Sequence, residues 1–159
     1  MSQVLWAEFG WTLTLPWPVV MVRILGSVIL TGIIGLEREA RNSAAGLRTH
    51  MLVGLAATTY CLITLEIMAQ THKDNARLDP LRMVEAVTGG VAFLAAGLIV
   101  FSKGAVRGLT TGASLWLTAS VGLAIGLGFW PVAIGVTLSG LFITAVLGAI
   151  AGAHRSDPR

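Results

Sequence analysis

Five stretches of about 20 predominantly apolar residues fill most of this chain and constrain its fold more than any other feature. They cover residues 17–36, 49–68, 83–101, 109–129 and 131–151. A helix needs about 20 such residues to cross the hydrocarbon core of a bilayer. Only 12% of the residues are charged, about half the usual share of a soluble domain. The sequence therefore predicts an all-α, polytopic membrane bundle of five transmembrane helices.

This pattern divides the chain into three parts. Residues 1–16 carry Trp6 and Trp11, and because tryptophan favours the headgroup zone, we expect an interfacial lead-in. Residues 17–152 form the five-helix transmembrane domain, and residues 153–159 form a short tail. No basic segment precedes the first apolar run, so we do not expect a cleaved signal peptide.

Lysine and arginine residues are distributed unequally between the two sides of this bundle. One side holds seven of them: Arg38, Arg41, Arg48, Lys103, Arg107, Arg155 and Arg159. The other side holds Lys73, Arg77 and Arg82, accompanied by two aspartates. Because basic loops remain in the cytoplasm, we predict an outside N-terminus and a cytoplasmic C-terminus. Basic residues confined to short loops between apolar spans also argue against a nucleic-acid partner.

Small residues recur at four-residue spacing within the spans. Such ladders let helix backbones approach closely in lipid, where no hydrophobic drive holds helices together. The ladders are Ser27, Thr31 and Gly35 in the first span, Ser114, Thr118, Gly122 and Gly126 in the fourth, Gly140, Thr144, Gly148 and Gly152 in the fifth, and Ala92 with Ala96 in the third. They indicate either packing within one chain or, on at least one ladder, the seam of a homo-oligomer, a dimer or higher.

Three charged residues lie inside the spans, namely Arg23, Glu66 and Glu85. Intramembrane charges are costly and often functional. One interpretation is an ion pair of Arg23 with Glu85 or Glu66 that locks helices together. The other is a path for a cation or a proton.

The loops on the cytoplasmic side are the richest in polar residues. Glu37 and Arg41 have the i, i+4 spacing of a helical ion pair, and Glu37 is the best candidate ligand for a hydrated Mg²⁺ ion, which needs only one or two carboxylates. The alternative is a solvated ion pair at a helix end. Arg48 with Thr49, and Arg107, stand at the starts of two spans, where free backbone N–H groups favour anions. A phosphate, a lipid headgroup or an acidic loop of another protein would fit there.

No pattern typical of an enzyme is present in the sequence. His50, His72 and His154 lack the spacing of metal ligands, no serine lies in a nucleophile elbow, and no phosphate-binding loop occurs. We expect no catalysis and no cofactor other than Mg²⁺.

Three motifs in this order resemble the signatures of the MgtC/SapB family. The first is Gly-Ile-Ile-Gly-Leu-Glu-Arg-Glu at 32–39, followed by Ala-Gly-Leu-Arg-Thr-His at 45–50. The second is Asp79 and Arg82 with the glycine- and alanine-rich run 90–97, and the third is Val-Arg-Gly-Leu-Thr-Thr-Gly-Ala-Ser-Leu-Trp at 106–116. On this resemblance the functional residues are Glu37, Arg38, Glu39, Arg41, Gly46, Arg48, Thr49, Arg82, Arg107, Thr110, Thr111, Ser114 and Trp116.

The sequence departs from the family pattern in its third span. Ala92 and Ala95 stand where glycine is usual, and Glu85 with Ala86 stands where a small residue and a glutamine are usual. Many members continue into a cytoplasmic C-terminal domain, so the chain is expected to be a short member without it.

The resemblance implies a role in adaptation to low magnesium and, in some members, in virulence. It also implies a membrane protein partner such as an F-type ATP synthase, which the protein would bind and restrain. Two hypotheses follow, a non-transporting regulator of a membrane partner and an oligomeric transporter or channel for Mg²⁺ or another cation. A lipid-organising role is the third alternative.

Overall fold

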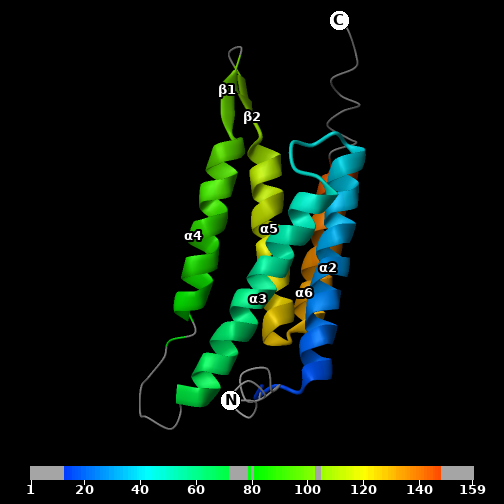
Figure 1. Cartoon of the computed structure of the whole chain (residues 1–159). Helices are drawn as coiled ribbons and strands as arrows, with labels where there is room; N and C mark the ends of the chain where they lie inside the picture. The colour runs from blue at the N-terminus through cyan, green and yellow to red at the C-terminus, as the bar shows by residue number, and fades with distance from the viewer. Residues whose placement is uncertain (1–12, 72–78, 80, 103–104, 148–159) are drawn as a thin grey trace, which may run out of the picture.

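The computed structural model describes residues 13–71, 79, 81–102 and 105–147, and it confirms a bundle of five helices (Figure 1). The order of elements is α2 (Trp17–Ala40), α3 (Leu47–Thr71), α4 (Leu81–Leu98), β1 (Val100–Ser102), β2 (Ala105–Arg107), α5 (Leu109–Leu127), α6 (Trp130–Phe142) and the π-helical turn η1 (Ile143–Leu147). Pro18 lies in the first turn of α2 and Pro131 in the first turn of α6, where a missing N–H costs no hydrogen bond.

Four of these helices, α2, α3, α4 and α5, are long and apolar enough to cross a membrane. The fifth is shorter, because the apolar helical stretch Trp130–Val146 has fewer than 18 residues. The predicted fifth span, 131–151, runs into residues outside the described part of the chain. The described fold is therefore that of a multi-pass membrane protein.

A small β-hairpin interrupts the third predicted span. Residues 83–101 were expected to be helical throughout, but α4 ends at Leu98, and β1 pairs antiparallel with β2, with Val100 opposite Arg107. Valine and phenylalanine at 100 and 101 favour extended backbone. Gly108 then adopts φ +87°, and a Cβ there would meet the carbonyl of Leu98. This turn directs the chain from the hairpin into α5.

Helix α5 is the centre of the bundle and contacts α2, α3, α4 and α6. In its most apolar 18-residue window 67% of the residues are buried, against 17% for α4. Figure 1 shows α4 and the hairpin standing to one side of the bundle, with α2 and α6 on the other. The buried stripe of α4, Met83, Val87, Val91 and Ala95, is its contact with the rest of the core.

The small-residue ladders of the first and fourth spans are buried within the chain, as one of the two interpretations predicted. All members of both ladders are buried. A Cβ on Gly35 would lie 2.7 Å from Leu47 Cα, and one on Gly122 would lie 2.5 Å from the carbonyl oxygen of Gly54. In the other two ladders, Gly140 is buried against Leu117, whereas Ala92 and Ala96 of α4 are exposed. Gly148 and Gly152 lie outside the described residues.

Replacing Gly122 by valine is expected to destabilise the bundle by about 1–3 kcal/mol, because the added side chain overpacks the contact between α3 and α5. Unfolding of the purified protein by SDS titration in detergent measures this change. Gly135→Val is the matched control, since a Cβ at Gly135 of α6 meets nothing within 4 Å. Equal midpoints for the two variants would show that the close contact contributes nothing.

Candidate functional site

The end of the bundle that carries Arg38, Arg41, Arg48 and Arg107, called here the basic end, holds most of the signature residues. The loop from α2 to α3 and the β-hairpin both lie at this end (Figure 1). It corresponds to the side that the distribution of basic residues assigns to the cytoplasm.

Glu37 joins two arginines and a threonine at the C-terminal end of α2. Its carboxylate contacts Arg38 through Nε at 2.5 Å and Nη2 at 2.7 Å, and it contacts Arg41 Nε at 2.5 Å. Thr144 Oγ1, from η1, lies 3.2 Å from the same carboxylate. The i, i+4 pair of Glu37 with Arg41 is confirmed, and the adjacent Arg38 adds a bidentate contact that spacing alone did not indicate.

This cluster is buried on the side of Arg38, whereas Arg41 of the predicted pair remains exposed. Arg38 is only 4% exposed, and a buried guanidinium requires a carboxylate partner. Arg41 also donates from Nη2 to the backbone oxygen of Ala145 at 2.7 Å, which ties α2 to η1. A Mg²⁺ ion at Glu37 would compete with two guanidinium groups for the same oxygens. Within the described part of the chain, no group of three or more His, Cys, Asp or Glu could hold a metal.

Glu39 and Gly46 form the start of α3. The carboxylate of Glu39 accepts a hydrogen bond of 2.7 Å from the backbone N–H of Leu47, the first residue of α3. An acceptor with negative charge at this position satisfies a free N–H group and interacts favourably with the helix dipole. A Cβ on Gly46 would lie 2.7 Å from the Glu39 carboxylate, so the glycine leaves room for this cap.

His50 connects the first and third signature motifs, a role that the sequence analysis missed. The side chain is fully buried. Nδ1 lies 2.8 Å from the Gly46 oxygen and Nε2 lies 3.1 Å from Ser114 Oγ, and the same hydroxyl lies 2.8 Å from Thr111 O, so its single proton is shared between these two acceptors. A carbonyl accepts only, so Nδ1 carries a proton. The one signal in the sequence was that His50 ends one motif and Ser114 lies in another.

The remaining signature residues of the basic end are exposed. Arg48 and Thr49 on α3, Arg107 at the end of β2, and Thr110 and Trp116 on α5 all face outwards, whereas Thr111 is buried. Anion binding at the two helix starts stays a prediction.

The opposite end places the intramembrane charges apart from one another. The ion pair predicted for Arg23 with Glu85 or Glu66 is wrong, because Arg23 Nη1 donates instead to the carbonyl of Gly126 at 2.7 Å. Arg23 thereby binds a carbonyl of the last turn of α5, where the helix dipole favours a cation. Glu66 accepts from the backbone N–H of Thr14 at 2.9 Å and from its hydroxyl at 3.0 Å. Glu85 is exposed on α4.

Arg82 and Asp79 mark the start of α4. Asp79 Oδ1 accepts from the backbone N–H of Leu81 at 2.9 Å, which satisfies one of the free donors of the first turn. Arg82 is exposed.

Four helices that are apolar and long enough to span a bilayer define a polytopic membrane protein. The sequence profile of the MgtC family matches residues 24–153. The chain belongs to the MgtC family, as the three motifs predicted.

Relatives from several bacteria share this region. YhiD of Escherichia coli K12, whose name proposes it as a magnesium transporter, is 35% identical over 127 residues, which are 79% of this chain and 59% of the relative. MgtC of Brucella abortus strain 2308 is 34% identical over 78% of this chain and 49% of its own length. SrpB of Synechococcus elongatus is 33% identical over 80% of this chain and 72% of its own length.

Most of these relatives are longer than the matched region. The chain spans about half to three-fifths of the length of the first relatives. No solved structure shows a significant match to this chain.

Glu37→Gln is expected to destabilise the protein by about 3 kcal/mol, because it leaves the buried Arg38 without a counter-charge. Thermal unfolding in detergent measures the loss. Glu85→Gln, at an exposed position on α4, is the matched control and should unfold at the same temperature as the wild type. A Glu37→Gln protein as stable as the wild type would mean that the cluster does not hold the basic end.

Ser114→Ala is expected to cost about 1–2 kcal/mol, because the buried His50 imidazole loses its partner at Nε2. Ser120→Ala on the same helix removes a hydroxyl that donates only to the backbone of Leu117, so the difference in unfolding midpoint isolates the contact with His50. Identical midpoints would rule out a role for this contact in joining α3 to α5.

Proposed function

We propose that this protein is a non-transporting regulator in the bacterial inner membrane, acting on a membrane partner during adaptation to low magnesium. The observation that supports it is the separation of the intramembrane charges. Arg23 binds the end of α5, Glu66 binds Thr14, and Glu85 faces outwards from α4. A transport path needs charged groups that face a shared interior or a water-filled cavity, and these three groups face different surroundings.

The outward face of α4 is the surface proposed to meet the partner. It comprises Glu85, Gly89, Ala92 and Ala96, all exposed, and a Cβ on Gly89 would meet nothing within 4 Å. Comparable small-residue faces of α2 and α5 are covered by neighbouring helices. Small exposed side chains let another helix approach closely in lipid.

A homo-oligomer, a dimer or higher, uses the same face in this proposal. An F-type ATP synthase remains the heterologous partner that the family resemblance implies. The small residues suit a helix of either kind, while Glu85 favours a partner with a basic or hydroxyl group near that end of the helix.

Transport of Mg²⁺ or another cation by an oligomer is the second candidate, favoured by the name given to YhiD. In that case separate copies would bring their Glu85 residues to a shared pore. The two candidates make opposite predictions for flux.

Purified protein in vesicles is expected to give no flux of Mg²⁺, Na⁺, K⁺ or H⁺, while the same chain restores growth of a strain lacking it at low magnesium. Ala96→Leu, which adds bulk to the outward face of α4, should reduce this growth at least fivefold in yield. Gly135→Leu, on the exposed face of α6, is the control and should leave growth unchanged. If the wild type gave flux and Glu85→Ala abolished it, the regulator proposal would be wrong and the transporter would be the better candidate.

A disulfide test examines the proposed oligomer seam directly. Cys61 is the one native cysteine of the sequence, so it is replaced by alanine to leave a single new cysteine in each variant. The new cysteine is placed at Ala96 or, as a control, at the exposed Val132 of α6. Oxidation in native membranes should join two copies through position 96 and not through position 132. Monomers at both positions would remove the seam from α4.

A further inference from the structure

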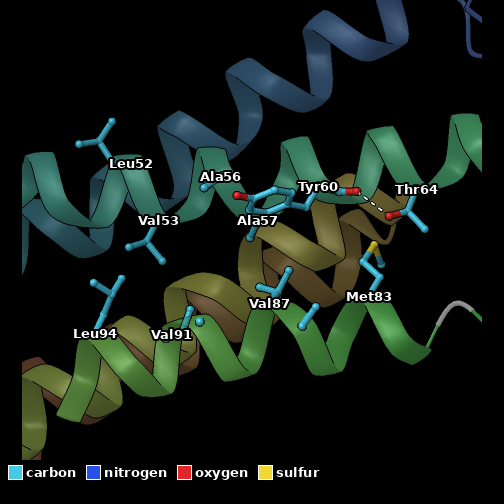
Figure 2. Close-up of a pocket in the computed structure, with 12 residues that line it drawn as sticks. Leu52, Val53, Ala56, Ala57, Tyr60, Thr64, Met83, Val87, Val91 and Leu94 are labelled. Atoms are coloured by element: carbon cyan, nitrogen blue, oxygen red, sulfur yellow. Dashed lines mark hydrogen bonds between the residues drawn. The ribbon is translucent and has the colours of Figure 1, made fainter. Parts of the chain in front are cut away.

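An apolar groove of about 640 Å³ lies between α3 and α4. Figure 2 shows its two walls, with Leu52 and Leu94 at one end and Thr64 and Met83 at the other. The lining is apolar apart from Tyr60 and Thr64, and the Thr64 hydroxyl donates to the Tyr60 carbonyl at 2.8 Å. Water in this groove would find few polar partners, so an apolar occupant is favoured.

The groove is long enough to hold an extended hydrocarbon chain. From Leu52 to Thr64 it follows α3 for 12 residues, which is about 18 Å at 1.5 Å per residue. An extended hydrocarbon chain has the shape that this space accepts.

Basic residues stand at one mouth of the groove. Arg48 is one helical turn before Leu52, and Thr49 is one turn before Val53, so each lies on the face of α3 that lines the groove. Both are exposed. Leu94 on the other wall leads to Leu98 and the hairpin, whose last residue is the exposed Arg107. Exposed basic residues that follow or precede both walls in sequence therefore lie toward the same end of the bundle.

We propose that this groove binds an anionic glycerophospholipid, with an acyl chain between α3 and α4 and the phosphate at Arg48, Thr49 and Arg107. Charge complementarity selects this occupant. Guanidinium groups match phosphate oxygens in a bidentate geometry, and basic pockets between membrane helices on the cytoplasmic side recognise anionic headgroups. The site shares no residue with the outward face of α4, so it stands independently of the proposed regulator.

Native mass spectrometry of the full chain in detergent tests the proposal, with dioleoylphosphatidylglycerol and dioleoylphosphatidylcholine as probes. The wild type should retain phosphatidylglycerol at least tenfold more strongly than phosphatidylcholine. Arg48→Ala with Arg107→Ala should reduce the preference to within twofold, while Arg82→Ala, an exposed arginine at the other end, leaves it unchanged.

A second pair of variants tests the groove itself. Gly90 lines the groove and has nothing within 4 Å of an added Cβ, so Gly90→Leu adds bulk to the groove at a position where the Cβ itself meets no neighbour. It should reduce retention of both lipids at least fivefold, and Gly135→Leu should not. Equal retention by wild type and Gly90→Leu overturns the site, and so does a headgroup preference that survives the double arginine variant. A Gly90→Leu variant that alters only the oligomer mass would assign the groove to a second copy and overturn the proposal.

Discussion

The close approach of α3 and α5 at glycine is the contact on which the rest of the structure depends. Lipid offers no hydrophobic drive between helices, so backbone contact and hydrogen bonds must supply the attraction. Gly122 lies against Gly54, and Thr58 donates to the carbonyl of Gly122 at 2.8 Å. His50 meets Ser114 with the same separation of 64 residues in sequence. The two helices therefore run parallel and in register, and the glycine contact between them fixes which signature residues meet at the basic end.

This register also determines where charge is tolerated. With α5 at the centre, its two ends are the places where backbone groups lack helical partners. Arg23 reaches the carbonyl of Gly126 at one end, and Gly128, with φ +85°, leaves space for the guanidinium, since a Cβ there would lie 2.8 Å from Nη2. At the opposite end of the bundle, the Glu37 cluster connects the end of α2 to η1 and does not involve α5. Both sets of charges lie at the ends of helices, and none of the three intramembrane charges meets another within the described residues.

Features that depend on local spacing could be predicted from the sequence, and features that depend on tertiary contact could not. The Glu37–Arg41 pair follows from one turn of helix, and the ladders of α2 and α5 follow from four-residue spacing. The partner of Arg23 is a backbone carbonyl 103 residues away, which carries no side-chain signal. The hairpin could not be predicted, because Val100 and Phe101 are as apolar as the residues of a membrane-spanning helix. His50 was missed because a metal-ligand test asks for other histidines, whereas its partners are a serine and a carbonyl.

Helix α4 differs from the other spans in how little of it the bundle uses. One stripe of four residues holds it to the core, the groove opens beside that stripe, and the small residues of its outward face are uncovered. If packing within the chain were the sole constraint on this helix, large apolar residues would serve its lipid-facing side equally well. Gly89 in that position lowers helix propensity without relieving any contact within the chain. The proposed contact with a second helix would account for this glycine, since a small side chain lets a neighbouring backbone approach closely in lipid.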